Sequence, residues 1–183
     1  MSIIFEPFPK LGRLSRTIVI TEKIDGTNAQ IIIGEDGSIG AGSRTRLITP
    51  KDDNFGFAAW VQDHRDDLMA LGPGRHFGEW WGSGIKRKYG LTEKRFSLFN
   101  VGRWHPDNPP PACCHVVPVL GRYTFDSGYI ERVMVDLKAT GSIAAPGFMS
   151  PEGIVVFHTA NGALFKKTFE GDEAGKGREP IAA

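Results

Sequence analysis

A lysine stands two residues before an Asp-Gly pair in residues 21–33, which read TEKIDGTNAQIII. The flanking runs TIVI and AQIII are typical of β-strands, so the charged residues between them form either a hairpin turn or an exposed strand end. Lys23 is then either a solvated turn residue or a nucleophile. A lysine amine is almost wholly protonated at neutral pH, so a nucleophilic Lys23 needs a site that favours the neutral amine.

Partial burial and neighbouring cations both favour the neutral form of a lysine. Later segments of the chain supply such cations, and the candidates are Arg44, Arg46, Lys166 and Lys167. The same side chains could bind a phosphate ester in the pocket, because cationic donors form strong hydrogen bonds to phosphate oxygens. Because K-x-D-G also occurs by chance, this segment alone leaves both interpretations of Lys23 open.

The elements that must position these residues are mostly β-strands. Apolar and β-branched runs predict strands over residues 17–20, 29–33, 75–81, 96–101, 153–158 and 163–169. Asp-Gly at 36–37 and Asn-Gly at 161–162 predict tight hairpin turns. Apolar residues at helical spacing predict helices over 55–71 and 127–141, each ending at a glycine. The proline-rich stretch that begins at His105 predicts a loop leading into a short strand.

Composition narrows the class of protein. The chain has 183 residues, 40% of them hydrophobic, and its 22 basic and 21 acidic residues give a net charge of +1. This balance excludes a strongly basic nucleic-acid binder, so any polyanion site must be local. The adjacent Cys113 and Cys114 fit neither a disulfide framework nor a zinc site, and no apolar run is long enough to span a bilayer. We expect a cytoplasmic protein that does not enter the membrane.

The segment KIDGTN (23–28) resembles the nucleotide-binding motif of the covalent nucleotidyltransferases, the superfamily of RNA ligases, ATP-dependent DNA ligases and mRNA capping enzymes. Five further segments resemble the later motifs of that superfamily, in the same order: SRT (43–45), FGEWWG (77–82), FSLFNV (96–101), PEGIVV (151–156) and LFKKT (164–168). The resemblance implies an α+β nucleotidyltransferase fold, the ATP-grasp-like adenylation fold of ligases. Two antiparallel β-sheets with flanking helices would surround a nucleotide cleft.

The resemblance also implies the domain organisation. It spans residues 20–168, so we expect one nucleotidyltransferase domain over 1–169 and a polar, flexible tail over 170–183. No separate carboxy-terminal domain is expected, because so few residues follow the last motif. The protein must then hold nucleic acid on the surface of this domain or through a partner protein. We expect a monomer.

The motifs imply roles for individual residues. Lys23 would attack the α-phosphate of ATP and hold AMP as a phosphoramidate, and Glu152, with Asp25, would orient the lysine or a divalent metal, Mg²⁺ or Mn²⁺. Glu79 would bind the ribose hydroxyls, and Phe99 would stack on adenine. The catalytic candidates are Lys23, Asp25, Glu152 and Lys166, and Glu152 is also the metal candidate. The nucleotide-binding candidates are Glu22, Lys23, Asn28, Arg44, Glu79, Phe99, Glu152, Lys166 and Lys167.

Two departures from the superfamily pattern bear on these roles. Asn100 stands where members often carry Asp. The last motif usually reads Lys-x-Lys, whereas here that spacing gives Lys166 and Thr168. Because alternate strand residues face opposite sides, Lys166 is the favoured phosphate ligand and Lys167 the less favoured one.

Asn28 follows the RNA ligase pattern, because capping enzymes generally carry arginine there, and this argues for ATP. The favoured prediction is therefore an ATP-dependent RNA ligase that joins 5′-phosphate and 3′-hydroxyl ends of RNA. The alternatives are a DNA ligase, with a nicked duplex or DNA as substrate, and a non-catalytic nucleotide- or strand-binding module of the same fold. The candidates for contact with nucleic acid are Asn28, Arg44, Lys86, Arg87 and Lys88, although the last three could equally form a solvated loop.

Overall fold

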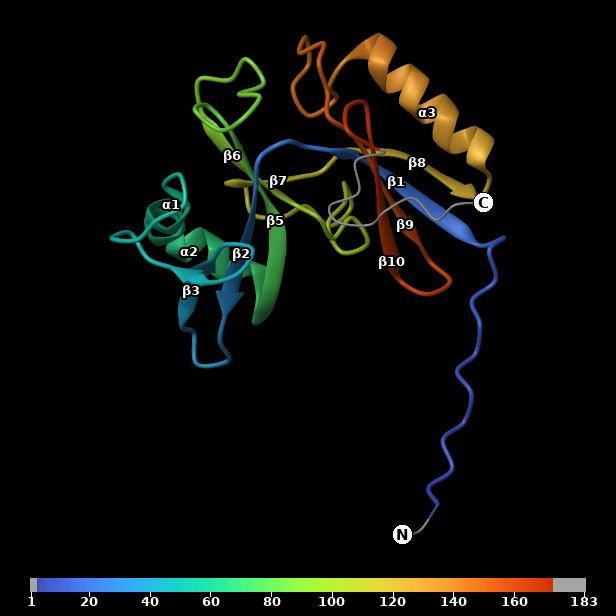
Figure 1. Ribbon diagram of the computed structural model, residues 1–183. Helices are drawn as coiled ribbons and strands as arrows, with labels where there is room; N and C mark the ends of the chain where they lie inside the picture. The colour runs from blue at the N-terminus through green and yellow to red at the C-terminus, as the bar shows by residue number, and fades with distance from the viewer. Residues whose placement is uncertain (1–2, 173–183) are drawn as a thin grey trace.

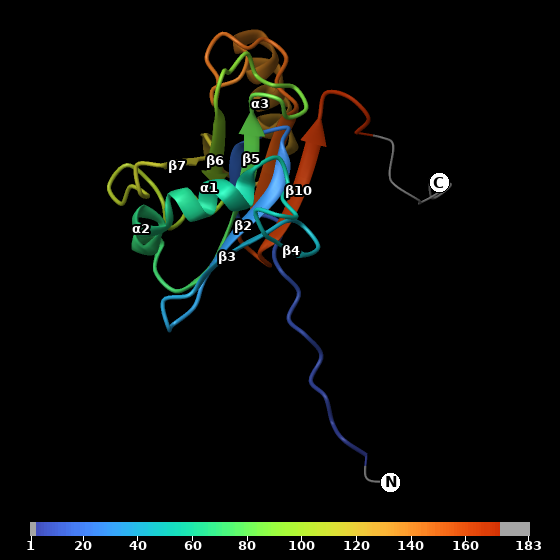
Figure 2. The same ribbon diagram turned by 90° about the vertical axis from the view of Figure 1, so that its left-hand side faces the viewer.

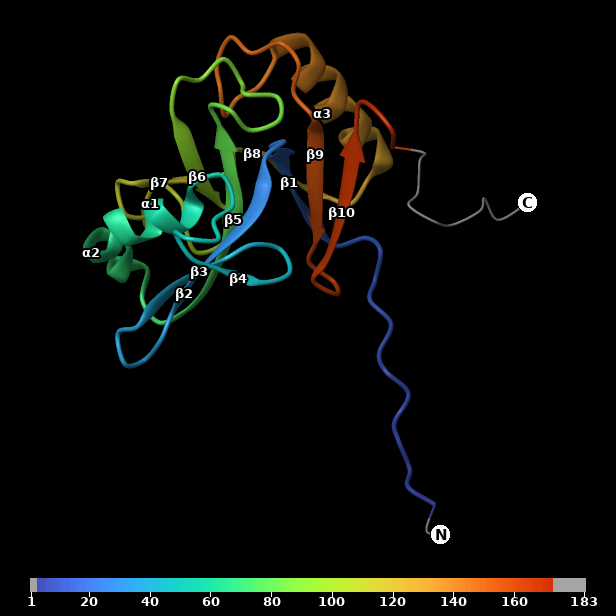
Figure 3. The ribbon, with the colours of Figure 1, turned by 60° about the vertical axis from the view of Figure 1, so that its left-hand side comes forward.

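The computed structural model describes residues 3–172, which form two β-sheets lying side by side (Figure 1). The helices lie on the outer sides: α1 and α2 beside one sheet, and α3 beside the other (Figure 1). Of the described residues before the first strand, those nearest the amino terminus extend away from this body (Figure 2, Figure 3). Among residues 3–172, no helix has the length and apolar character that a bilayer crossing requires.

The four-stranded sheet is antiparallel throughout and contains Lys23. Its strands, in spatial order, are β10 (Ala163–Thr168), β9 (Gly153–His158), β1 (Thr17–Lys23) and β8 (Val119–Thr124). The helix α3 (Ser127–Thr140) packs on one face, and the Asp126 carboxylate accepts a hydrogen bond from the N–H of Gly128 at its start. This packing buries the apolar stripe of α3 against β1 and β9; the buried residues are Ile18, Ile20, Val133, Met134, Leu137, Ile154 and Val156.

The six-stranded sheet contains the remaining motif strands. Its order is β4 (Leu47–Ile48), β3 (Ile39–Gly42), β2 (Thr27–Ile33), β5 (Gly74–Gly82), β6 (Lys94–Leu98) and β7 (Cys114–Val116). Its outer face is covered by α1 (Phe57–Asp63), α2 (Arg65–Leu68) and the 3₁₀ helix η1 (Met69–Leu71). Phe57, Trp80 and Phe96 are central to this core. A smaller apolar cluster joins the Lys23 end of β1 to this sheet; its buried residues are Ile24, Trp81, Tyr89, Val117 and Ala145.

The predicted strands and hairpins are largely confirmed. Each of the six predicted runs overlaps a strand, and the two predicted turns join β2 to β3 and β9 to β10. Gly162 has φ of 68°, the left-handed backbone that such a turn favours. The predicted helix 127–141 corresponds to α3. The strands β3, β4 and β8 were not predicted, and β3 lies in the glycine-rich sequence IGAG, which carries little strand signal.

One alternative left open by the sequence is decided, and two predictions about the fold are wrong. The runs 17–20 and 29–33 do not form a hairpin, because β1 and β2 belong to different sheets and the chain crosses between them after Lys23. Lys23 is therefore at a strand end, the other alternative. The six-stranded sheet is not wholly antiparallel, because β7 pairs parallel to β6.

The second wrong prediction is a continuous helix over residues 55–71. The backbone leaves the α region at His64 (φ −108°, ψ 19°), and the chain continues as α2 and η1. The carboxylate of Asp53 accepts hydrogen bonds from the N–H groups of Ala58 and Ala59, which fixes the start of α1. The apolar periodicity still identifies the buried face of this segment, because the spacing of apolar residues does not depend on unbroken helical hydrogen bonds.

Candidate functional site

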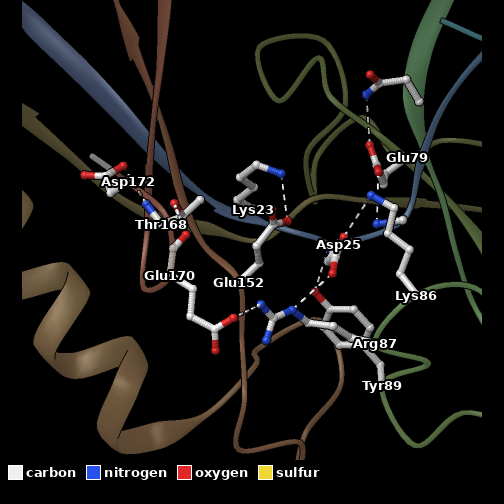
Figure 4. Close-up of polar contacts among 12 residues, drawn as sticks. Lys23, Asp25, Glu79, Lys86, Arg87, Tyr89, Glu152, Thr168, Glu170 and Asp172 are labelled. Atoms are coloured by element: carbon white, nitrogen blue, oxygen red, sulfur yellow. Dashed lines mark hydrogen bonds and ion pairs between the residues drawn. The ribbon is translucent and has the colours of Figure 1, made fainter. Parts of the chain in front are cut away.

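The site begins with an ion pair between two neighbouring strands. Lys23 ends β1 and pairs in register with Gly153, the first residue of β9, so Glu152 lies immediately beside it. The Nζ of Lys23 lies 2.7 Å from Oε2 of Glu152, and both side chains are partly exposed, at 23% and 18% (Figure 4). Lys23 thus lies at a strand end, pairs with one carboxylate and is partly exposed. A ligand in the solvent can therefore reach its amine.

A second carboxylate, Glu79 on β5, forms hydrogen bonds with the segment that follows Lys23. Its Oε1 accepts a hydrogen bond from the N–H of Gly26 (3.0 Å), and its Oε2 accepts one from the side chain of Asn28 (3.1 Å). Asn28 and Glu79 are directly opposite in the β2–β5 pairing. Gly26 passes so close to β5 that a Cβ there would lie 2.7 Å from Cβ of Trp81 and against the carbonyl of Trp80. Only glycine fits this close approach.

The surroundings of Glu79 shift the pKa of its carboxyl group to near neutrality. Burial raises its pKa to about 7, because a charged carboxylate loses hydration there. The positive charge of Lys23 and the N–H of Gly26 lower the pKa, and the negative charge of Glu152 raises it. These contributions show that the two carboxylates and the lysine share one electrostatic environment.

The aromatic residues of β5 and β6 divide between two faces. Phe99 follows β6 directly, and its N–H donates to the carbonyl of Phe77; the two side chains are 42% and 52% exposed. Alternation along β5 places Phe77 and Glu79 on the same face of the sheet. Trp80 and Trp81, in contrast, are both buried in different apolar clusters, so neither offers a stacking surface.

The model of one known protein family matches most of the chain. The family model described as RNA ligase matches residues 16–168. The chain belongs to the RNA ligase family. This match covers both sheets and every strand from β1 to β10.

Solved structures of RNA ligases share the fold. A mutant of Naegleria gruberi RNA ligase in its apo form matches with a TM-score of 0.62 and 18% identity, over 88% of this chain and 52% of that chain. Another mutant, with AMP and Mn, matches with a TM-score of 0.60 and 18% identity, over 90% and 53% of the two chains. A third, with ATP and Mn, gives 0.59 and 18% identity, over 84% and 49%. The chain thus spans about half the length of the solved chains that it matches.

The structure separates the two lysines of the last motif. Lys166 pairs with Val155 on β9, which pairs with Thr21 on β1, so Lys166 lies on the sheet face that Lys23 shares. Lys167 lies on the opposite face, beside α3. Its Nζ is 3.2 Å from Glu131 of α3 and 3.9 Å from Asp172. Lys166 is exposed, and the choice between the two lysines as phosphate ligand stays a prediction.

The basic loop Lys86, Arg87 and Lys88 does not form a uniform solvated surface. Lys86 and Arg87 both pair with the carboxylate of Asp25, at 3.3 and 3.1 Å, whereas Lys88 is exposed (Figure 4). Two of the three cations thus pair with a carboxylate beside Lys23, although Lys86 and Lys88 are both exposed. Contact of these three residues with nucleic acid stays a prediction.

The structure places Glu22 away from the group around Lys23. Because it precedes Lys23 in β1, its side chain faces the opposite side of the sheet, where it is 1% exposed. Its carboxylate accepts hydrogen bonds from the hydroxyl of Ser142 (2.5 Å) and from the N–H groups of Ile143 and Ala144 (both 2.9 Å). Burial raises the pKa of Glu22, and these donors oppose the rise. The side chain of Glu22 thus anchors the loop after α3, and contact of Glu22 with a nucleotide stays a prediction.

Arg44 and Asn100 are less directly linked to Lys23 than the residues above. Arg44 lies in the exposed loop between β3 and β4, and within residues 3–172 it has no hydrogen bond or ion pair that directs it toward Lys23. Asn100 accepts a hydrogen bond from the N–H of Arg103, so it stabilises the turn after β6.

The sequence prediction missed Tyr89, whose hydroxyl accepts a hydrogen bond from the N–H of Asp25 (2.7 Å). An aromatic residue inside a basic loop was the available signal.

A cavity of about 500 Å³ lies elsewhere, where residues 12–14 approach β9, β10 and the start of α3. Apolar side chains such as Phe125 line it together with Lys166 and Lys167, whereas Lys23, Glu79 and Glu152 do not. The candidate active site is therefore defined by its polar side chains and not by this cavity.

The acidic residues of the site bear on metal binding. Within residues 3–172, no three or more histidine, cysteine or acidic side chains are grouped as metal ligands. Glu152 is partly exposed and supplies hard carboxylate oxygen. Magnesium typically binds through one or two carboxylates together with waters and substrate phosphates, so this donor set fits Mg²⁺ or Mn²⁺ that arrives with a nucleotide.

Proposed function

We propose that this chain is an ATP-dependent RNA ligase that forms a lysyl-AMP intermediate on Lys23 and joins 5′-phosphate and 3′-hydroxyl ends. The observation that carries the proposal is the 2.7 Å ion pair between Lys23 and Glu152 at a partly exposed strand end. It supplies a nucleophile, a carboxylate that orients it, and access for a ligand. Membership of the RNA ligase family supports the same reaction.

The first step is transfer of AMP to the lysine. The neutral amine of Lys23 attacks the α-phosphorus of ATP, an N–P bond forms, the bond to the bridging oxygen breaks, and pyrophosphate leaves. The amine nitrogen releases a proton in this step. Glu79 and Phe99 are proposed to bind the ribose hydroxyls and the adenine, and Lys166 the phosphates. Such positioning matters because in-line phosphoryl transfer depends on geometry and charge stabilisation.

Two further transfers complete the reaction. A 5′-phosphate oxygen of the RNA attacks the phosphorus of the adduct, which breaks the N–P bond and frees Lys23. A 3′-hydroxyl then attacks the 5′-phosphate, and AMP leaves. Asn28 and Arg44 are proposed to contact the RNA end, and a partner protein could add to this grip. Mg²⁺ or Mn²⁺, held by Glu152 and by phosphate oxygens, would neutralise the charge of the leaving pyrophosphate; related ligase structures contain Mn together with ATP or AMP.

The test is the intact mass of the purified protein after incubation with ATP and Mg²⁺. The expected result is a gain of one AMP that is acid labile and absent in Lys23→Ala, since a phosphoramidate forms only on the nucleophile. GTP and NAD serve as nucleotide controls. The protein must first be freed of adduct formed during expression, by incubation with pyrophosphate.

Absence of any adduct under all three nucleotides would overturn the proposal and favour a binding module of the same fold. If the adduct forms, sealing assays with nicked and single-stranded RNA and with nicked DNA decide the substrate. Sealing of DNA alone would replace the RNA ligase by the DNA ligase alternative.

A further inference from the structure

The loop between β5 and β6 has a strained backbone at three residues close together. Lys86, Lys88 and Tyr89 have positive φ values of 43°, 60° and 51°. Such values are uncommon for residues other than glycine, and they persist only where surrounding contacts determine them. Ile85 and Tyr89 supply these contacts, because both side chains are buried. The loop is thus held in one shape at a cost in backbone energy.

That shape brings three side chains of the loop onto Asp25. The Nε of Arg87 lies 3.1 Å from Oδ2 of Asp25, and the Nζ of Lys86 lies 3.3 Å from Oδ1. The hydroxyl of Tyr89 accepts a hydrogen bond from the N–H of the same aspartate. Figure 4 shows these side chains converging on Asp25, beside the Lys23–Glu152 pair. Both carboxylate oxygens and the backbone at Asp25 are therefore fixed from one loop.

Arg87 also reaches two other segments of the site. Its Nη1 donates to the carbonyl of Ser150 (3.3 Å), two residues before Glu152, and its Nη2 to the carboxylate of Glu170 (3.3 Å), just after β10. A guanidinium can hold all three partners because its donors spread in a rigid plane, whereas an ammonium is a single compact centre. Arg87 thus joins the turn after Lys23 to the segment that precedes Glu152.

We propose that Arg87 is a positioning residue for the transfer of AMP to Lys23, acting through Asp25 and the carbonyl of Ser150. This inference rests on the proposed function. Lys23 adjoins the segment that follows β1, and Glu152 ends the segment that precedes β9. Arg87 fixes these two segments relative to each other without touching either reacting group. Small displacements of a nucleophile have large effects on rate, so the bond network of Arg87 sets the alignment of Lys23 for attack.

The first variant is Arg87→Lys, which keeps the charge and removes the three-way geometry. We expect kcat for lysyl-AMP formation to fall about 10- to 100-fold, with KM for ATP changed less than about twofold, because the lost contacts align the nucleophile and do not bind nucleotide. Arg132→Lys, on the exposed side of α3, is the matched control. Glu93→Gln is a second control: Glu93 is an exposed partner of Arg95, and its loss should change the rate little.

A double-mutant cycle with Asp25→Asn and Arg87→Ala separates positioning from a general structural role. If Arg87 acts through Asp25, adding Arg87→Ala to Asp25→Asn lowers the rate little further, because one contact is lost in both variants. Additive losses would overturn the inference. Thermal unfolding of each variant shows whether it is folded. If Arg87→Ala does not fold, the kcat and KM of Arg87→Lys test the positioning role instead.

The outcomes also distinguish this inference from the proposed function. A wild type that forms the adduct, with Arg87→Lys equally fast, overturns the positioning role and leaves the ligase proposal intact. A fall in kcat and a rise in KM by the same factor likewise overturns positioning, in favour of nucleotide binding by Arg87. A wild type without any adduct on Lys23 overturns the proposed function, and the inference with it.

Discussion

Lys23 and Glu152 are 129 residues apart in the chain, yet their charged groups lie 2.7 Å apart. The register of β1 on β9 enforces this approach, because Lys23 pairs with Gly153 and leaves Glu152 just beyond the strand end. Such an ion pair, about one-fifth exposed, orients the lysine more than it stabilises the fold.

Glu152→Gln should therefore slow lysyl-AMP formation while leaving the protein folded. The amide keeps the shape of the side chain but cannot pair with the ammonium or offer a charged oxygen to a metal. We expect a loss of about 100-fold or more in rate, comparable with removing one electrostatic group from an active site. The measurement is adduct formation over time by intact mass, with Glu93→Gln, an exposed carboxylate paired with Arg95, as the control. Equal rates for Glu152→Gln and wild type would contradict this role.

Gly26→Ala should damage the same site through sterics alone. Its Cβ would lie against the carbonyl of Trp80, 2.7 Å from Cβ of Trp81 and 3.0 Å from Cγ of Glu79. We expect a loss of about 1–3 kcal/mol in the free energy of unfolding, the usual cost of overpacking, together with slower adduct formation.

Gly40→Ala is the matched control for Gly26→Ala, because nothing lies within 4 Å of a Cβ built at Gly40. Its effect should stay within about 0.5 kcal/mol. Urea unfolding of both variants measures the difference. If the two substitutions prove equally mild, β5 does not constrain the turn after Lys23 as the structure indicates.

Much of this site could be predicted because its residues stand in short segments with local signals. Lys23 and Glu152 adjoin apolar strands, and a strand end is a local property. Strand alternation also predicts that the side chains of Glu22 and Lys23, adjacent in β1, face opposite sides of the sheet. The buried carboxylate of Glu22 is the result of that alternation.

The remaining features depend on pairing between distant segments. Nothing near Cys114 in the sequence specifies that β7 lies parallel to β6, because the choice of strand partner is not local. The contact of Arg87 with Asp25 likewise requires left-handed backbone at Lys86 and Lys88, which their residue types do not indicate. The basic loop therefore resembled a solvated surface in the sequence and became part of the site in the structure.

Glu79 should make stability depend on pH. Burial raises its pKa from the ordinary 4.5 to about 7, so the folded state favours the protonated carboxyl. That contribution is fully present below about pH 4.5 and is lost as the pH rises through about 7. Relative to Glu79→Gln, which does not titrate, the wild type should lose about 3 kcal/mol at most between these limits.

Urea unfolding of wild type and Glu79→Gln at pH 5 and pH 8 measures this loss. The free energy of unfolding of the wild type, minus that of the variant, should be smaller at pH 8. Glu93→Gln, whose parent side chain is exposed, should show no such trend. A difference that stays constant with pH would mean that Glu79 is ionised in the folded protein throughout this range.

Lys166→Ala and Lys167→Ala should differ because the two side chains face opposite sides of β10. Lys166 shares the face of Lys23, and its loss should weaken ATP use in adduct formation by about tenfold or more, as expected for removal of a charged phosphate ligand. Lys167 pairs with Glu131 and Asp172 beside α3, so its loss should cost about 0–1 kcal/mol of stability and leave adduct formation nearly unchanged. Both variants are compared by adduct formation against ATP concentration and by urea unfolding. A larger loss of activity in Lys167→Ala than in Lys166→Ala would require the strand to present its other face to the nucleotide, contrary to the register that pairs Lys167 with Ile154.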